Sequence, residues 1–200
     1  MSAGAQVDPR FVELHKWALD AFATAAIFAR RASRYRRLVE WLTFIGLAIP
    51  VVVGGIALAD YKDPRFLTEA VVIGVTFAVV IGVLSLWSVV AQWPDNLEYS
   101  SSSNADNHRL SSQMKALANQ ASKPPADFEV RFNELKTLND VQNASDNRKN
   151  ISGWEEIYGH RAALRQFNTR CDVCDVVPLS MDMLFWKRNR CPRCGGPKKK

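Results

Sequence analysis

Charged residues are missing from two long stretches of this sequence, residues 41–59 and 70–94. As helices these stretches would span roughly 28 and 37 Å, against about 30 Å for the hydrocarbon core of a bilayer. The alternative is a pair of buried helices in a soluble protein, but such helices normally carry a polar stripe. The sequence therefore predicts a transmembrane helical hairpin with spans at about 41–59 and 70–92. Because neither span contains an ionisable residue, we do not expect a proton relay or a voltage sensor.

Catalytic motifs are also missing. The three histidines, His15, His108 and His160, are isolated in the sequence and have no nucleophile or ligand at a telling distance. The sequence has no glycine-rich phosphate loop and no HExxH motif, so we do not expect an enzyme. It has no secretory signal either, since its first forty residues are charged and amphipathic. We therefore expect the two spans to be permanent anchors.

Cysteine is missing from the first 170 residues and then occurs as two Cys-x-x-Cys pairs, separated by sixteen residues. Their members are Cys171, Cys174, Cys191 and Cys194. Two such pairs supply four thiolates to one tetrahedral Zn²⁺ ion, so we predict a small structural zinc ribbon with a short hairpin between the pairs. Gly195-Gly196 suits the tight turn of the second pair. Disulfides are the main alternative, although a reducing compartment disfavours them, and a thioredoxin-like site would need a strand-helix setting that is absent.

Basic residues are clustered, and they predict an orientation. Five arginines lie within residues 30–37, just before the first span, while the connector at residues 60–69 carries a net charge near −1. Lys and Arg concentrate on the cytoplasmic side of short loops. We therefore expect a two-span protein of the inner membrane with both termini in the cytoplasm and only the turn around 61–64 outside.

The segment before the arginines predicts one helix from Asp8-Pro9 to about Leu38, within a region 8–40. Its apolar residues recur every three or four positions: Phe11, Leu14, Ala18, Ala21, Ala25, Phe28, Ala32 and Tyr35. Such a seam is typical of packing against a partner helix. An amphipathic helix lying on lipid is the alternative.

Small residues recur at every fourth position in both spans, namely Gly46, Pro50 and Gly54 in the first and Gly74, Ala78 and Gly82 in the second. Such faces let membrane helices approach closely. They favour either packing within the hairpin alone or a homo-oligomer around a path lined by Thr76, Ser85, Ser88 and Gln92. Pro50 is expected to kink the first span.

After Pro94 the sequence becomes polar, and residues 95–167 predict a cytoplasmic helical region. One helix has a face of Leu110, Met114, Leu117 and Ala121 and ends at Lys123-Pro124-Pro125; a second follows Asp127. Asn143 to Lys149 is expected to be a loop, and Ser152 with Glu155 to open a third helix that ends near Phe167. The Ser100 to Ser103 run is either a flexible break or a continuing helix.

The expected fold is an all-α membrane protein with an N-terminal helix (8–40), a transmembrane hairpin (41–93), cytoplasmic helices (95–167) and a zinc ribbon with a basic tail (168–200). The tail, which ends in Lys198, Lys199 and Lys200, could contact nucleic acid or anionic lipid, or it could merely solvate a structural cap.

This order of parts resembles the bacterial SLATT family, two-transmembrane effector domains of nucleotide-linked antiphage systems. The resemblance covers about residues 9–167 and includes the alanine-rich helix ending in arginines (Ala25 to Arg37) and the segment WEEIYGHRAALRQF. It implies an effector that oligomerises on an infection signal, delivered by a partner encoded with it, and then breaches the membrane. The zinc ribbon is not part of that basic form.

Two functions therefore stand beside each other. The first is an effector that forms a pore or disrupts the membrane. The second is a membrane-anchored zinc-ribbon adaptor that binds a protein or nucleic acid. A purely structural membrane protein is a third possibility.

Overall fold

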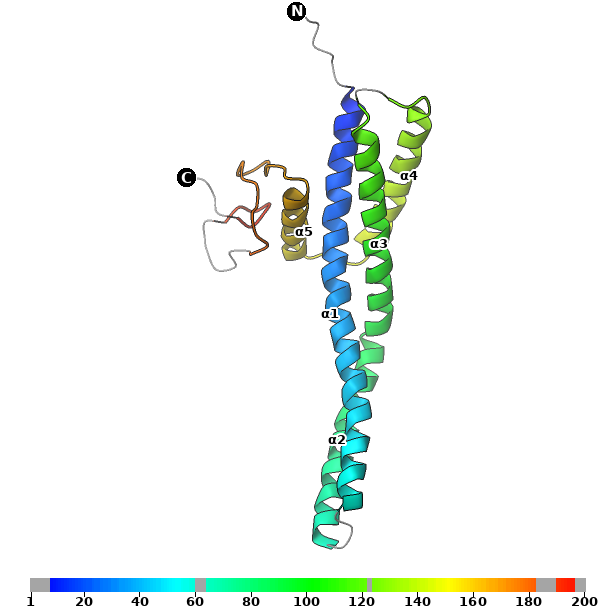
Figure 1. Ribbon diagram of the computed structural model, residues 1–200, viewed down its shortest axis with the longest axis vertical. Helices are drawn as coiled ribbons and strands as arrows, with labels where there is room; N and C mark the ends of the chain where they lie inside the picture. Colours follow the sequence, from blue (N-terminus) through cyan, green and yellow to red (C-terminus); the bar gives the residue numbers. More distant parts are fainter. Residues whose placement is uncertain (1–7, 60–63, 122–123, 183–189, 197–200) are drawn as a thin grey trace, which may run out of the picture. The chain divides into compact units, whose positions relative to one another are not determined.

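The computed structural model describes residues 8–59, 64–121, 124–182 and 190–196. Within these ranges the chain is mostly helical and contains no β-strand. The helices are α1 (Pro9–Ala59), α2 (Pro64–Val90), α3 (Trp93–Ala118), α4 (Phe128–Asn147) and α5 (Gly153–Gln166), labelled in Figure 1. The chain divides into two compact units, the first made of Met1–Arg30 with Ser100–Lys200 and the second of Arg31–Tyr99.

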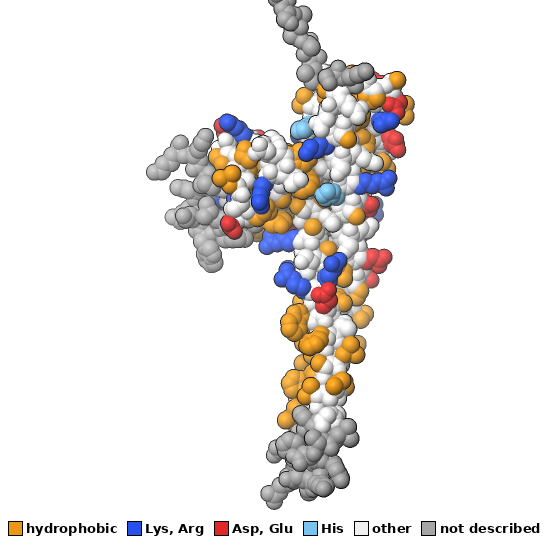
Figure 2. Space-filling view, in the orientation of Figure 1, with side chains coloured by type: hydrophobic (Ala, Val, Ile, Leu, Met, Phe, Trp, Pro, Cys, Tyr) orange, Lys and Arg blue, Asp and Glu red, His pale blue; other side chains and the backbone are white. Residues whose placement is uncertain are grey.

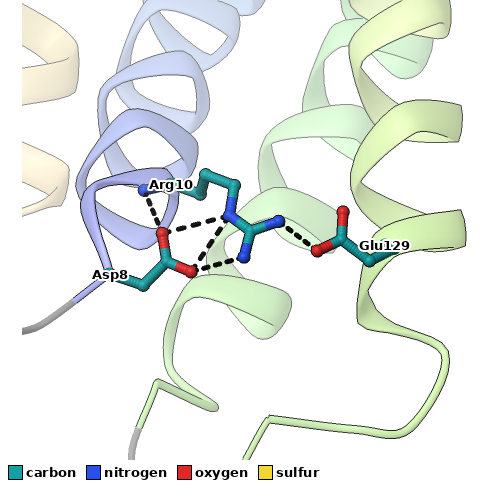
Figure 3. Close-up of polar contacts among 3 residues, drawn as sticks. All are labelled: Asp8, Arg10 and Glu129. Atoms are coloured by element: carbon teal, nitrogen blue, oxygen red, sulfur yellow. Dashed lines mark hydrogen bonds and ion pairs between the residues drawn. The ribbon is translucent and has the colours of Figure 1, made fainter.

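The start of α1 is fixed by Asp8, as the Asp-Pro pair predicted. The Asp8 carboxylate accepts the backbone N–H of Arg10 at 3.0 Å, and the Asp8 carbonyl accepts that of Phe11 at 3.0 Å. The Arg10 guanidinium pairs with the same carboxylate and also reaches Glu129 near the start of α4 (Figure 3). Arg10 thus ties the beginnings of two helices in the first unit together.

The predicted end of the first helix near Leu38 is wrong, because α1 continues through the arginine cluster and through Pro50 to Ala59. No glycine or proline interrupts residues 31–45, and arginine and leucine are good helix formers. The amphipathic segment and the first apolar segment therefore belong to one helix of 51 residues.

The first part of the apolar seam of α1, namely Phe11, Leu14 and Ala18, belongs to the core of the first unit, where α1, α3 and α4 lie side by side (Figure 1). Seven of the eight predicted positions of the seam are buried, and only Tyr35 is half-buried. Phe11 stacks on Phe128 with ring centroids 4.6 Å apart, and Trp17 lies 5.4 Å from Phe132. This burial confirms the interpretation that the seam packs against partner helices rather than lipid.

Helix α3 runs through the serine-rich segment without a break and buries a polar seam. Its members are Ser100, Ser103, Asn107 and Ser111. The Ser111 hydroxyl donates to the carbonyl of Ala18 in α1 at 2.6 Å. On the same helix Leu110, Met114 and Leu117 are buried as the sequence predicted, and α3 ends at Ala118.

The predicted loop at 143–149 is also wrong, because α4 extends to Asn147. The reason is Asp146, which is buried and accepts hydrogen bonds from Ser103 Oγ and Asn107 Nδ2 of α3, each at 2.6 Å. These bonds between helices hold the last turn of α4 against α3. Tertiary contacts thereby override the weak helix propensity of the Asn/Ser/Asp sequence.

Helix α5 begins with the predicted capping box. The Ser152 hydroxyl accepts the backbone N–H of Glu155, and the Glu155 carboxylate accepts the N–H of Ser152. Gly159 brings α5 against α1, since a Cβ added there would lie 2.5 Å from the carbonyl oxygen of Ala23.

The second unit presents its apolar side chains outward. Within the described residues one helical segment, Val71–Val90, is long and apolar enough to cross a membrane, and 6% of it is buried. The first predicted span, 41–59, does not add a second such segment; its described side chains, such as Phe44 and Val51, are largely exposed. Figure 2 shows hydrophobic side chains gathered over this unit. The turn at 61–63 lies outside the described residues.

Candidate metal centre

Each cysteine pair forms a turn of the same backbone design. In the first, Cys171 N–H donates to the carbonyl of Val176 at 3.1 Å and Asp175 N–H donates to that of Cys171 at 2.8 Å. In the second, Cys191 N–H donates to Gly196 at 2.7 Å and Gly195 N–H to Cys191 at 2.9 Å. We call these two turns, residues 171–176 and 191–196, the first and second knuckle.

Both knuckles need a left-handed residue directly after their second cysteine. Gly195 fills this position with φ 66°, as its place in the sequence predicted, because glycine adopts this conformation without steric cost. Asp175 fills it in the first knuckle with φ 54°, and aspartate is among the side chains that tolerate this region best. Its carboxylate accepts a hydrogen bond from Arg170 at 3.0 Å.

The two knuckles bring the four predicted cysteines together. All four side chains are buried, and all four are free thiols. The Cys171 and Cys191 sulfurs are 3.9 Å apart, and those of Cys174 and Cys194 are 3.5 Å apart. A tetrahedral metal with bonds of about 2.3 Å to sulfur requires sulfurs about 3.8 Å apart, whereas a disulfide needs about 2.05 Å. The four sulfurs therefore fit one metal ion and do not form disulfides.

The surroundings of the thiols separate their pKa values. Burial raises the pKa of Cys194 and that of Cys171, because a thiolate loses solvation there. Burial also acts on Cys191, but the backbone N–H groups of Cys194 and Arg193 stabilise its thiolate and lower its pKa. A bound metal cation would stabilise the thiolates of Cys171 and Cys194, because its positive charge offsets their loss of solvation.

Helices α1 and α5 hold the metal centre in the first unit. The four cysteines form one buried cluster with Leu164 of α5, and Leu19 of α1 and Val176 pack against it. The knuckles therefore rest on the helices through a small apolar contact that is separate from the main core.

Arg161 is a supporting residue that the sequence reasoning missed. Its side chain is buried and donates from Nε to the carbonyl of Ser180 at 2.7 Å and from Nη1 to the carbonyl of Cys194 at 3.0 Å. The available signal was its position, because Arg161 continues the apolar series Ile157 and Leu164 on α5 at helical spacing. An arginine on an apolar face needs buried acceptors, and here they are carbonyls of the cysteine region.

The expectation that His160 is isolated is wrong. Its ring lies within 4.8 Å of Cys171 and Asp172 in a group able to hold a metal, and Nε2 is 4.0 Å from the Asp172 carboxylate. Burial and the nearby Arg193 lower the pKa of His160. The fold creates this proximity by docking the first knuckle on α5. His15 and His108 instead pack against Phe167 and Phe22.

The predicted pore-side hydroxyl groups do not share one environment. Ser88 is buried, whereas Thr76 is exposed and donates its hydroxyl hydrogen bond to the carbonyl of Val72 in its own helix at 2.8 Å. Ser85 and Gln92 are exposed. The predicted hairpin between the knuckles and the terminal lysines fall largely on residues 183–189 and 197–200, outside the described residues.

The fold and the site together define a class: a mostly helical protein with a C-terminal four-cysteine module that fits a metal ion. The chain belongs to the family described as Mobilome CxxCx(11)CxxC protein, which matches residues 12–197. The match covers α1 to α5 as well as all four cysteines, so the helices and the metal module are parts of one family architecture. This chain has sixteen residues between its pairs, where the family description has eleven. No curated protein and no solved structure matches it.

Proposed function

We propose that this protein is an inner-membrane effector that self-associates through its apolar helices and forms a pore or disrupts the bilayer. The observation that supports this best is the state of the glycines in the apolar segments. Gly54 and Gly82 are exposed and Gly46 is half-buried, and a Cβ added at any of the three would meet no atom within 4 Å. These three glycines thus leave space beside their helices. They remain available to helices of other copies.

Val71–Val90 supplies one span in this proposal, and residues 41–59 supply the other. The arginines at residues 30–37 support a cytoplasmic location of both termini in this proposal. The resemblance to the SLATT family extends the proposal to antiphage defence, in which a signalling partner triggers assembly. The word mobilome in the description of the matched family is compatible with such a setting.

Zinc is the metal we propose for the four cysteines, because four thiolates in tetrahedral arrangement are its usual structural ligand set. Cys171, Cys174, Cys191 and Cys194 would bind it, and the ion would fix the knuckles against α1 and α5. Its role here is structural and regulatory rather than catalytic.

Membrane potential during induced expression tests the effector. Wild-type protein is expected to depolarise cells within the induction period. Gly82→Leu is expected to abolish this effect by blocking helix approach, while Val83→Leu, a similar apolar change at the neighbouring exposed position, leaves it intact. Membrane fractionation verifies equal insertion of all three proteins. If abundant, inserted wild-type protein leaves the potential unchanged, the effector proposal fails.

A membrane-anchored adaptor is the second candidate, and the separate compact core of the first unit favours it. In this case the hairpin is only an anchor, and the metal module binds a protein or nucleic acid. Gly82→Leu would then behave as wild type, whereas Cys191→Ser would remove function. The same experiment with both variants separates the two candidates.

A further inference from the structure

A cavity of about 610 Å³ lies in the first unit between residues 20–27 of α1, the start of α5 and the second knuckle. Its size falls in the range of small-molecule sites. Asn147 of α4 and Ile151 complete the lining, which includes none of the four cysteines. The cavity is thus a separate feature of the same unit.

Two arginines line this cavity, Arg193 within the second knuckle and Arg190 directly before it. Arg190 lies over the ring of Trp154, with Cζ 4.0 Å from the ring centroid, so the aromatic face orients its guanidinium. One terminal nitrogen of Arg190, Nη1, is buried without a hydrogen-bond partner, an arrangement that costs free energy until an acceptor arrives. Arg193, which is exposed, supplies a second positive charge to the lining. Such planar, oriented donors match phosphate oxygens.

The first turn of α5 also borders the cavity. Gly153 and Trp154, its first two residues, are part of the lining. Ser152 caps this helix start, and Glu155 and Glu156 offset the positive end of the helix dipole. The attraction for an anion therefore comes from the arginines.

Two carboxylates also line the cavity, Asp20 from α1 and Glu156 from α5. A simple anion would gain nothing from them. Ile27 and Ile157 give the lining an apolar part. The combination matches a ligand that carries a phosphate, a hydrogen-bond donor and a carbon part.

We propose that this cavity binds an organic phosphate that also carries an amine or hydroxyl donor, with the phosphate on Arg190 and Arg193 and the donor on Asp20 or Glu156. This ligand chemistry occurs both in soluble phosphate monoesters and in phospholipid headgroups. The inference goes beyond the proposed membrane activity and does not depend on it. It does depend on the folded second knuckle, because Arg190 and Arg193 flank Cys191.

Calorimetry on the metal-loaded full chain in detergent, in phosphate-free buffer, tests the proposal with phosphoethanolamine, inorganic phosphate and ethanolamine as probes. We expect phosphoethanolamine to bind more tightly than phosphate, and ethanolamine not to bind. Arg190→Gln or Arg193→Gln should weaken phosphoethanolamine binding by about tenfold or more, since each removes charge-assisted hydrogen bonds. Arg165→Gln on the exposed face of α5 is the matched control and should bind as wild type. Metal content, measured for each variant, reports whether the knuckles are intact.

Glu156→Gln provides a second variant that leaves the arginines and the fold in place, because Glu156 is exposed. It should weaken phosphoethanolamine binding and leave phosphate binding unchanged. The source of the ligand is then tested in nanodiscs of phosphatidylethanolamine or phosphatidylcholine. If phosphatidylethanolamine but not phosphatidylcholine raises the unfolding temperature, and Arg190→Gln removes the effect, the ligand is a lipid headgroup. If phosphoethanolamine binds equally well in both kinds of nanodisc, the ligand is a soluble ester. The proposal is overturned if no probe binds, or if metal-loaded Arg190→Gln and Glu156→Gln proteins both bind phosphoethanolamine as wild type does.

Discussion

At the scale of the residue, one arginine connects the metal centre with the helices. Arg161 lies on α5, and its two hydrogen bonds end on carbonyls of Ser180 and Cys194. The cysteines themselves were predictable from spacing, because ligand chemistry restricts residue type and separation strongly. Arg161 and His160 were not, because their roles arise only when α5 meets the knuckles. Supporting residues of a metal site commonly escape sequence motifs for this reason.

Arg161→Ala should weaken metal retention. The change leaves two carbonyls without their charged donor, and hydrogen bonds to charged groups contribute about 1.5–3 kcal/mol each. We expect a markedly faster loss of zinc to a chelator and a lower unfolding temperature. Arg165→Ala, at an exposed position of the same helix, should change neither quantity. Equal zinc release from both variants would contradict the role assigned to Arg161.

Asp8 should titrate at unusually low pH. Its pKa lies below the ordinary 3.8, first because the Arg10 side chain donates hydrogen bonds to it and then because the Arg10 backbone does. The pair therefore stabilises the folded state above the ordinary carboxyl pKa, and this contribution is lost as the pH falls through the lowered value. Carboxyl-resolved NMR titration measures the shift.

The matched variants for Asp8 are at its two neighbours. Arg10→Ala should return the pKa of Asp8 to its ordinary range. Glu129→Gln should leave it low, because Glu129 pairs with Arg10 and makes no direct contact with Asp8. An unshifted Asp8 in the wild type would show that the pair does not persist in solution.

At the scale of the element, helices with regular apolar spacing were predictable and their ends were not. The seam of α1 is buried where the spacing placed it, since period and burial are directly linked. The capping box of α5 is equally local and was found. The extension of α4 to Asn147 depends on Asp146 reaching α3, 39 and 43 residues away in sequence. No local pattern contains that contact.

Gly159→Ala should destabilise the packing of α5 on α1. A Cβ would lie 2.5 Å from the carbonyl oxygen of Ala23 and 2.7 Å from Cγ1 of Ile27, so the helices must separate. Overpacking of this kind typically costs about 1–3 kcal/mol, more than the roughly 1 kcal/mol that alanine gains in helix propensity.

Thermal unfolding monitored by circular dichroism checks this prediction. Gly153→Ala is its natural control, because Gly153 lies in the same helix and a Cβ there meets nothing within 4 Å. That variant should be neutral or slightly more stable. A Gly159→Ala protein as stable as Gly153→Ala would mean that the two helices do not approach closely in solution.

At the scale of the whole molecule, the metal module and the helical core are stabilised separately. The cysteine cluster shares Leu164 and Leu19 with the helices, but the main core of α1, α3 and α4 uses none of its residues. The family match joins both parts into one architecture, and sequence alone suggested them in the same order. The exposed apolar segment of α2 could be read from composition, because it depends on hydropathy and length alone.

Chelation of the metal should therefore loosen the knuckles and spare the helices. We expect trypsin to cut more rapidly after Arg170, Arg190 and Arg193, while cleavage after the exposed Arg109 of α3 keeps its rate. Far-ultraviolet circular dichroism should lose little intensity. Global unfolding on chelation would show instead that the metal stabilises the entire first unit.

The buried polar seam of α3 has a consequence for how this protein can move. Apolar helix surfaces can slide past each other by one turn, about 5.4 Å, and still make equivalent contacts. The Ser111 bond to Ala18 and the Ser103 and Asn107 bonds to Asp146 each have one partner at one height. A slip by one turn would leave these buried groups without hydrogen-bond partners. The bonds therefore hold α1, α3 and α4 in one register. We therefore expect a signal that reaches this bundle to move it as a rigid body rather than to slide its helices past one another.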